Sequence, residues 1–290
     1  MHYRTKSGRI FDLGITIFFI LLSAAMMFPI YYIIVISFSS SQDLTMNRFL
    51  LWPKHWDFSA YRYILNSESF RRAMLFTIYI TGLGTVCNLL FTSTMAYGLT
   101  KQIYGQKVLL FMVTFTLLFG AGMIPSYLVV KAMGLRDSIW ALILPNVINS
   151  FNLIVMRQFF KNIPNEIQEA GVMDGANPMQ IFIRIILPLS KPALAAFGLF
   201  YAVDYWNSYF NAILYINDPH KWPIQVILRQ IVIINEPTAT LGRSVMMQNP
   251  PQPESIQMAA ILLATLPVLL VYPFLQKHFA KGVMIGSIKG

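Results

Sequence analysis

Six long stretches of the chain carry almost no charged residues, and they constrain its fold more than any other feature. A helix rises about 1.5 Å per residue, so about 20 apolar residues cross the hydrocarbon core of a bilayer. Five stretches contain no charge, and the sixth contains only Asp204. We therefore predict an all-α membrane protein with six transmembrane helices, at Leu13–Phe38, Ala73–Thr100, Val108–Val130, Ser138–Met156, Pro192–Ile216 and Ile256–Gln276.

The composition agrees with a membrane protein and excludes other classes. Hydrophobic residues make up 56% of the chain and charged residues only 12%, roughly half the share in soluble domains. The net charge is +10, but the basic residues are scattered between the uncharged stretches, without the interleaved aromatics of a nucleic-acid surface. We therefore expect membrane lipid, and no nucleic acid, as a partner.

The segments between the predicted spans indicate a single membrane domain over residues 1–290. An even number of spans puts both chain ends on the same side. Two long outer loops, at residues 39–72 and 217–255, are too short and irregular for a second globular domain. If the N-terminus is inside, the inner segments hold 12 of the 22 Lys and Arg residues and the outer ones 10. The positive-inside rule supports this orientation by only a small margin.

The inner segment at residues 161–188 predicts a helix–turn–helix along the membrane surface. Pro164 suits a first helical position, and Glu166 and Glu169 follow in the early turns, where the helix dipole favours acids. Asp174-Gly175-Ala176-Asn177-Pro178 then supplies turn chemistry, before apolar residues resume. That shape suits docking into a groove on a partner.

The same segment carries a family motif. It reads Glu169-Ala170-Gly171, three residues, Gly175, nine residues, then Ile185, one residue and Leu187-Pro188. This resembles the EAA signature of ABC-importer permeases, E-A-A-x3-G-x9-I-x-L-P, and only Gly171 departs from it, where alanine is usual. Because the constrained positions span twenty residues in an inner segment, an ordinary amphipathic connector is a much weaker explanation.

The resemblance extends over nearly the full length. It is closest to the carbohydrate-uptake, maltose-type permeases, and among them to members that import polysaccharide-derived oligosaccharides. Supporting stretches include Trp52-Pro53-Lys54, Ala96-Tyr97-Gly98-Leu99-Thr100-Lys101, Gly134-Leu135-Arg136-Asp137-Ser138 and Trp206-Asn207. The resemblance implies a type I ABC-importer permease fold, multi-pass in the bacterial cytoplasmic membrane, with both termini cytoplasmic.

The resemblance also implies roles and partners. The helix–turn–helix would be the coupling helix that docks on a cytoplasmic ATPase, with Glu169, Ala170 and Gly175 at the contact. The expected ATPase-coupling residues are Glu169, Ala170, Gly171, Asp174, Gly175, Ile185, Leu187 and Pro188. The implied partners are a second homologous permease subunit, a P-loop ATPase dimer that binds ATP and Mg, and an extracytoplasmic solute-binding protein. The chain would then import a sugar or oligosaccharide by alternating access.

The sequence holds no constellation for catalysis. The P-loop pattern Gly-x4-Gly-Lys-Ser/Thr is absent, since no Gly-Lys dipeptide occurs. The four histidines are far apart, and Cys87 is the single cysteine, so neither a metal site nor a nucleophile–base pair is indicated. We expect no catalytic residue, metal or bound cofactor on this chain.

Polar residues inside the fifth predicted span are candidates for the translocation path. An ionised carboxylate facing lipid is costly, so Asp204 should face protein or water. If the span is one continuous helix, a single face carries Asp204, Asn207, Ser208 and Asn211, flanked by Tyr201, Tyr205 and Tyr209. Such groups suit a polyhydroxylated solute. Hydrogen bonding between neighbouring helices explains them about equally well.

Other features leave alternatives open. Asn146, Asn149 and Asn152 favour helix–helix hydrogen bonding in the fourth span. Gly120-Ala121-Gly122 would loosen or kink the third span, and close helix packing explains these residues equally well. For function, an importer of peptides, amino acids or anions shares the coupling motif. An ATP-independent secondary transporter is the alternative from a different class, and a membrane-bound enzyme is a third.

Overall fold

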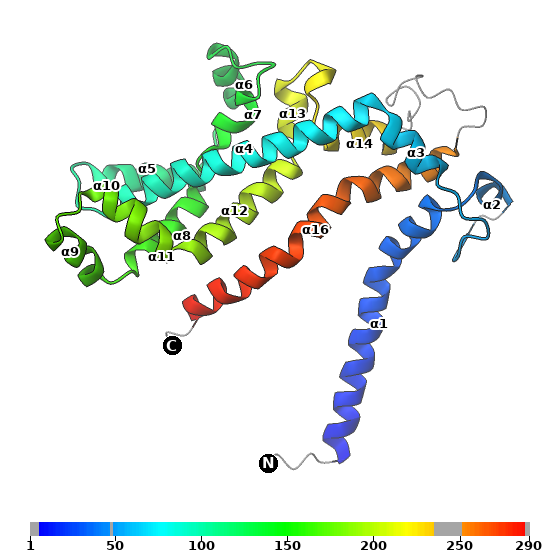
Figure 1. The fold of residues 1–290 in the computed structure, drawn as a ribbon, viewed down its shortest axis with the longest axis horizontal. Helices are drawn as coiled ribbons and strands as arrows, with labels where there is room; N and C mark the ends of the chain where they lie inside the picture. Colours follow the sequence, from blue (N-terminus) through cyan, green and yellow to red (C-terminus); the bar gives the residue numbers. More distant parts are fainter. Residues whose placement is uncertain (1–5, 47–48, 235–250, 288–290) are drawn as a thin grey trace. The chain divides into compact units, whose positions relative to one another are not determined.

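Helices make up the regular structure of the part of the chain that is described. The computed structural model describes residues 6–46, 49–234 and 251–287, and Figure 1 shows its helices. The elements are α1 (Lys6–Ser37), α2 (Ser41–Met46), α3 (Ser59–Asn66), α4 (Glu68–Gly98), α5 (Gln106–Leu118), α6 (Met123–Ala132), α7 (Trp140–Ile143), η1 (Leu144–Asn146), α8 (Ser150–Lys161), α9 (Asn165–Met173), α10 (Pro178–Ile181), η2 (Phe182–Ile186), α11 (Leu187–Leu189), α12 (Lys191–Trp206), α13 (Phe210–Tyr215), η3 (Pro219–Lys221), α14 (Ile224–Val232) and α16 (Pro253–Ser287). Within these ranges the only strand-like pairing is an isolated bridge between Ser39 and Trp56. The all-α prediction is confirmed.

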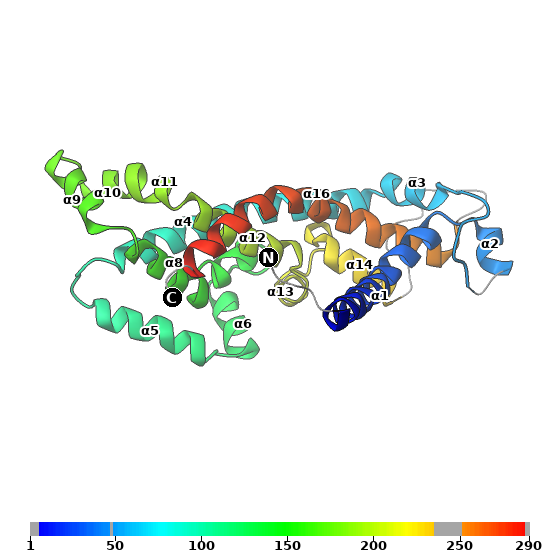
Figure 2. The ribbon, with the colours of Figure 1, turned by 90° about the horizontal axis from the view of Figure 1, so that it is seen from below.

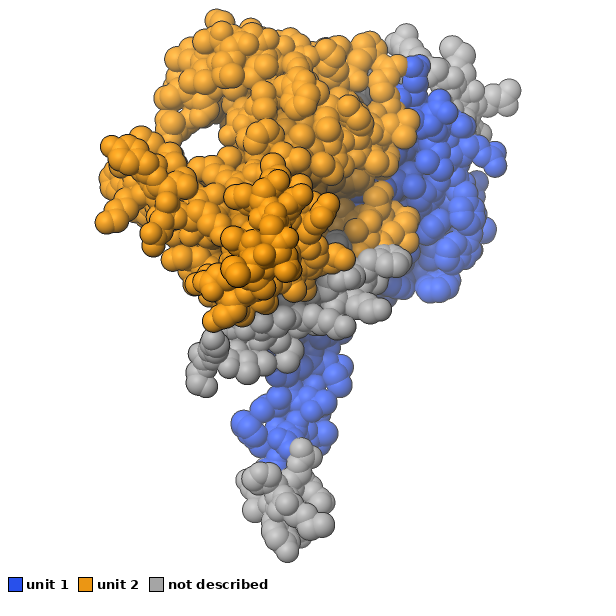
Figure 3. All heavy atoms as spheres, turned by 60° about the vertical axis from the view of Figure 1, so that its left-hand side comes forward, with its two compact units in different colours: residues 1–71, 228–265 blue, residues 72–227, 266–290 orange. Residues whose placement is uncertain are grey.

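The helices fall into two compact units, coloured separately in Figure 3. Unit 1 comprises residues 1–71 and 228–265, and unit 2 comprises residues 72–227 and 266–290. In unit 1, Val35 and Ile36 of α1 pack on Leu50. The described part of unit 2 has three buried clusters, one around Tyr97 and Phe182, one around Leu99, Val113 and Leu153, and one around the residues Ile80, Leu142, Ile143, Tyr205 and Tyr215.

Three helices in the described ranges are long and apolar enough to cross a bilayer. They are Phe11–Ser37 within α1, Glu68–Gly98, and Pro253–Tyr272 within α16. These match the first, second and sixth predicted spans to within a few residues. A fourth results if Pro178–Leu189 and Lys191–Trp206, which are bent by 81° at Ser190, are counted as one span.

The structure interrupts Val108–Val130 at Gly120-Ala121-Gly122, where the sequence predicted a loosened or kinked span, whereas the prediction of continuous helices at Ser138–Met156 and Pro192–Ile216 is wrong. The interruption of Val108–Val130 lies between α5 and α6 (Figure 2), where Gly122 adopts φ +84°, a left-handed conformation that glycine reaches without strain. No atom would contact a Cβ at Gly120 or Gly122 within 4 Å, so the backbone turn, rather than close packing, explains these glycines.

The other two interruptions have different causes. In the fourth predicted span, the 3-10 turn η1 contains Pro145, and Asn149 then caps α8 by accepting a hydrogen bond from the backbone N–H of Asn152 at 3.1 Å. In the fifth, α12 ends at Trp206, and the side-chain amide of Asn207 donates to the carbonyl of Val203 at 2.9 Å. The asparagines therefore stabilise helix ends instead of lining one continuous helix.

One buried side chain connects two of these interrupted segments. The amide of Asn88, in the middle of α4, donates to the carbonyl of Asn146 at 3.0 Å, at the end of η1. The side-chain oxygen of Asn88 accepts a hydrogen bond from the hydroxyl of Tyr205 on α12 at 2.8 Å. A carbonyl released from a helix ladder inside a membrane needs such a partner, because no water replaces it.

The predicted outer loops contain short helices. Residues 39–72 hold α2, α3 and the start of α4, and residues 217–255 hold η3, α14 and the start of α16. Residues 235–250 of the second loop lie outside the described residues, as do both ends of the chain.

Asp137 joins the ends of two interrupted spans. It is the one non-glycine residue of the described chain with positive φ, at 57°. Its carboxylate accepts hydrogen bonds from the backbone N–H groups of Asn217 and Asp218, and its carbonyl accepts from the Lys221 ammonium at 2.7 Å. The hydrogen bond from Asn217 lowers the pKa of Asp137 below its ordinary value of 3.8, against a smaller opposing effect of burial.

We predict that Asp137→Ala lowers the melting temperature of the detergent-solubilised protein more than Asp137→Asn does. Alanine removes the acceptor and is strained at positive φ, whereas asparagine keeps an oxygen and tolerates that conformation. Because the folded-state pKa is lowered, the carboxylate's contribution to stability is complete above pH 3.8 and is lost as the pH falls through the lowered pKa. Equal melting temperatures for the two variants would contradict this role.

Candidate functional site

The segment at residues 161–188 folds as the predicted helix–turn–helix. Helix α9 ends in a Schellman motif around Gly175, whose φ is +80°. The N–H of Ala176 donates to the carbonyl of Gly171 at 3.0 Å, and that of Gly175 to Val172 at 2.9 Å. Asn177 and Gln180 then form a capping box, with both hydrogen bonds at 2.9 Å, that starts α10.

The return arm of this motif is irregular. After α10 the backbone forms a π-helical turn, η2, over Phe182–Ile186, and continues through α11 into the 81° bend before α12. Pro188 has no N–H to extend an α-helical ladder, which favours a change of hydrogen-bonding pattern here. Single π turns within α-helices are common at functional sites.

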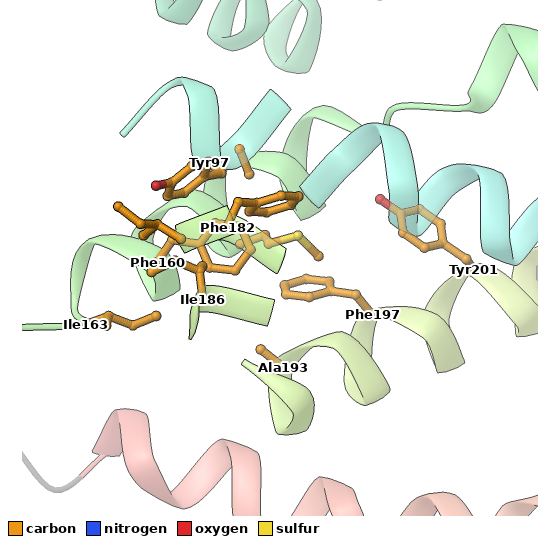
Figure 4. Packing of buried hydrophobic residues seen from close by; sticks show 11 residues of the cluster. Tyr97, Phe160, Ile163, Phe182, Ile186, Ala193, Phe197 and Tyr201 are labelled. Atoms are coloured by element: carbon orange, nitrogen blue, oxygen red, sulfur yellow. The ribbon is translucent and has the colours of Figure 1, made fainter. Parts of the chain in front are cut away.

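An aromatic cluster fastens the return arm to the C-terminal end of α4. The ring of Phe182 stacks on Tyr97 at 4.9 Å between centroids, with an interplanar angle of 23°. Phe160 of α8 meets the same tyrosine edge-on at 6.5 Å. Figure 4 shows these rings together with Ile186 and Phe197, which extend the buried cluster from η2 to α12. A displacement of η2 would therefore shift residues that pack directly on α4 and α12.

Polar contacts complete this attachment. The Lys101 ammonium, just beyond α4, donates to the side-chain oxygen of Gln168 on α9 at 2.5 Å. The carbonyl of Leu99 accepts from Arg157 at 2.8 Å and from Gln106 at 2.7 Å. A cationic donor at a helix C-terminus is favourable because the helix dipole is negative there.

The predicted coupling residues divide into an outward and an inward group. Glu169, Ala170, Asp174, Gly175 and Pro188 are exposed, Ile185 and Leu187 are partly buried, and Gly171 is buried. The outward surface also carries large apolar side chains, of which Met173 is 86% exposed; the others are Ile167, Val172, Met179 and Ile183. Exposed apolar groups of this size on one small element indicate an interaction surface.

Gly171 faces the return arm and not the exposed surface. A Cβ at this position would lie 2.9 Å from Cδ1 of Ile185 and 3.5 Å from Cγ1 of Ile181. The missing methyl group therefore lets α9 sit closely on the return arm. The sequence pattern placed Gly171 in the coupling segment but could not indicate which way it points.

Asp204 lines a cavity of about 870 Å³ in unit 2. The cavity walls come from α4, α12 and α16 and are largely apolar; besides Asp204, polar groups come from Thr81, Trp206 and Tyr272. The Thr81 hydroxyl is buried and has no hydrogen-bond partner among the described residues. Among the lining residues, Asp204 therefore supplies the carboxylate that an occupant would meet.

Tyr201 and Tyr205 point toward α4 instead. The Tyr201 hydroxyl bonds to Thr92 at 2.8 Å, and the Tyr205 hydroxyl to Asn88 at 2.8 Å. The Tyr205 ring lies over Gly84, where a Cβ would be only 2.4 Å from the ring. For these two residues, hydrogen bonding between helices is the role that the geometry supports.

The predicted polar face is not continuous. It required one helix through Asn211, but α12 ends at Trp206 and α13 begins at Phe210. Asn207 caps its own helix, and Ser208 continues the turn through its backbone N–H, which donates to Tyr205 at 3.1 Å. Of the six path candidates, Tyr201, Asp204, Tyr205, Asn207, Ser208 and Asn211, only Asp204 lines the cavity.

Sequence reasoning missed Asn88 and Gly84, because nothing in the pattern of α4 separates them from other small or polar residues. No cluster of three His, Cys, Asp or Glu side chains suited to a metal occurs among the described residues.

Comparison with known proteins gives close relatives. No family model matches. The chain is 48% identical over 289 residues to Protein LplC of Bacillus subtilis, covering 99% of this chain and 98% of that protein. It is 47% identical over 284 residues to the polygalacturonan/rhamnogalacturonan transport system permease protein YtcP of the same organism, covering 98% and 99%.

A solved structure matches the fold as well. A chain of a bacterial ABC transporter involved in the import of the acidic polysaccharide alginate has 35% sequence identity and a TM-score of 0.90, with 96% of this chain and 100% of that chain covered.

We predict that Gly171→Ala and Ile185→Val compensate each other. In Gly171→Ala, the added methyl group lowers the unfolding free energy by about 1–3 kcal/mol through overpacking. The higher helix propensity of alanine offsets about 0.5–1 kcal/mol of that loss. Ile185→Val alone costs about 0.5–1.5 kcal/mol. In the double variant the new Cβ occupies the space that Cδ1 leaves, so the loss of unfolding free energy should be smaller than the sum. Strictly additive losses, measured by thermal unfolding of all four proteins, would contradict the packing described.

Proposed function

Because the chain belongs to the carbohydrate-uptake permeases of ABC importers, we propose that it forms half of a membrane pathway for acidic oligosaccharides. It is a multi-pass permease of the cytoplasmic membrane in a binding-protein-dependent importer. The permease itself is not a catalyst, and ATP binds to the partner ATPase. The acidic substrate is supported by two relatives named for polygalacturonan/rhamnogalacturonan transport and alginate import.

The observation that carries the coupling role is the exposed surface of α9 and α10. It presents Glu169, Ala170 and Gly175 beside two exposed apolar residues, Val172 and Met173. Gly171 lies on the opposite side, where it lets α9 pack closely on the return arm. A small apolar surface with a carboxylate suits a cleft that offers apolar walls and a basic or hydrogen-bonding group. We assign this surface to the ATPase contact.

The path of coupling follows the contacts within unit 2. Closure of the ATPase dimer would move α9, and the Phe182–Tyr97 stack would transfer that movement to α4. The bend at Ser190 would transfer it to α12, which carries Asp204 at the cavity. Hydrolysis would then reset the spans inward, as alternating access requires.

The proposed topology has six spans. We count α5 with α6, α7 with α8, and α12 with α13 as interrupted spans, which transporters tolerate where broken helices are buried in protein. With the proposed ATPase contact on α9, both termini would lie in the cytoplasm. Relatives matched over 98–99% of their length support one permease domain over residues 1–290. The further partners would be a second homologous permease, the ATPase dimer and the solute-binding protein.

The coupling assignment predicts a selective loss of the ATPase. In the tagged, gently solubilised complex, Glu169→Arg should abolish recovery of the ATPase while the second permease remains. Lys107→Glu, a charge reversal of an exposed residue on α5 outside the α9–α10 surface, is the control and should retain the ATPase. Loss in both variants, or in neither, would argue against Glu169 as a contact residue.

The path assignment predicts different effects for two adjacent residues. Asp204→Asn should raise uptake of a labelled oligogalacturonide in proteoliposomes without changing the melting temperature, because it removes from the cavity a carboxylate that repels an acidic solute. Tyr205→Phe should lower stability by about 1–3 kcal/mol, since Asn88 loses its buried partner. Unchanged uptake by Asp204→Asn would remove that residue from the path.

A further inference from the structure

The chain that follows α1 folds back along the helix it has just left. The ring of Phe49 stacks on Tyr32 at 5.6 Å and on Phe28 at 6.4 Å between centroids. Leu50 is buried against Val35 and Ile36, and the Tyr31 hydroxyl donates to the carbonyl of Leu51. All of these contacts lie within unit 1.

These contacts set the depth of the segment relative to the span. Helix α1 ends at Ser37, and Phe28 lies nine residues earlier, about 13 Å along the helix axis. Residues 11–31 of α1 are all exposed and form most of the apolar stretch Phe11–Ser37, as expected of a lipid-facing helix. Phe49 therefore lies beside the last third of the candidate span Phe11–Ser37.

Aromatic contacts and a backbone hydrogen bond hold this segment in place. Phe38 stacks on Tyr61 at 4.7 Å and contacts Trp56 at 5.7 Å, and Trp52 meets Trp56 edge-on at 5.9 Å. The N–H of Asp57 donates to the carbonyl of Phe38 at 2.9 Å, which closes the turn.

A buried carboxylate fixes the middle of the segment. Asp43 accepts the backbone N–H of His55 at 2.8 Å and contacts the imidazole Nδ1 at 3.1 Å. These contacts tie His55, which precedes Trp56 in the chain, to α2.

The outward face of this structure is aromatic and basic. Trp52 is 62% exposed and Trp56 54% exposed, and Phe49, Leu51 and Phe58 are exposed as well. Lys54 and His55 lie between the two tryptophans. Tryptophan and tyrosine concentrate where the bilayer meets water, with basic residues reaching the headgroups. A surface that only met water would leave this apolar area unexplained.

We propose that residues 49–58 form an interfacial anchor in the outer leaflet. Phe49, Leu51 and Trp52 face the boundary between acyl chains and headgroups, and Lys54 and His55 face the phosphates. The occupant of this surface is lipid, because the segment continues the lipid-facing surface of α1 and its deepest ring reaches Phe28. The solute-binding protein would reach only what projects beyond the headgroups.

The test is a depth measurement on the assembled importer in phospholipid nanodiscs. Nitroxide labels are attached to Leu51→Cys, Trp52→Cys and Lys54→Cys, each in a Cys87→Ser background that removes the only native cysteine. Collisions with oxygen, which concentrates in the bilayer, are compared with collisions with a water-soluble nickel chelate. We expect oxygen to dominate at Leu51 and Trp52 and the ratio to shift toward the chelate at Lys54.

Two outcomes would overturn the proposal. The first is equal chelate access at all three positions, which would place the segment in water. The second is protection at Leu51 and Trp52 that appears only when the solute-binding protein is added, which would make this a protein-docking surface. Unlabelled protein gives an independent measurement: bromine-labelled lipids should quench the wild-type tryptophan fluorescence more than that of Trp52→Phe.

Discussion

The structure depends on satisfying backbone groups that interrupted helices release inside a membrane. Water is absent there, so each freed N–H or C=O must find a partner in the protein. Asn88 meets this need in unit 2. Its side-chain N–H donates to the carbonyl of Asn146, and its side-chain oxygen accepts from the Tyr205 hydroxyl. One buried side chain thus lets η1 depart from helical geometry and holds α12 against α4. The close approach over Gly84 makes the Tyr205 bond possible.

In unit 2, packing and polar contacts converge on the last turn of α4. Tyr97 stacks on Phe182, and Lys101 reaches Gln168 on α9. The motif segment is therefore fastened to two spans through rigid aromatic contacts, while its exposed side remains open to a partner. In the proposed coupling, this division between a buried base and an exposed surface lets a push on α9 reach the spans. The π turn and the bend at Ser190 are the irregular points on that route.

Helix α12 separates two kinds of polar residue that are adjacent in sequence. Tyr201 and Tyr205 bond to α4, whereas Asp204 lines a largely apolar cavity. Residues four apart share a face of a helix, and their immediate neighbours point elsewhere. The structural and the proposed solute-facing roles can therefore lie side by side in one span. An acidic oligosaccharide passing Asp204 would meet a like charge, which makes this carboxylate a candidate determinant of charge selectivity in the proposed pathway.

The sequence alone determined the all-α membrane class, the positions of α1, α4 and α16, and the helix–turn–helix at residues 161–188, because hydrophobic length and turn chemistry are local properties. The motif spacing identified the family for the same reason. Only the tertiary structure decided that the fourth and fifth predicted spans are interrupted, because an uncharged run looks the same whether or not a distant Asn88 binds a freed carbonyl. It also decided that Gly171 faces Ile185, and that Asp204 lines the cavity whereas Tyr205 points toward α4. Those orientations depend on which neighbouring helix packs on each face, and contacts between residues far apart in the chain leave no periodic trace in the sequence.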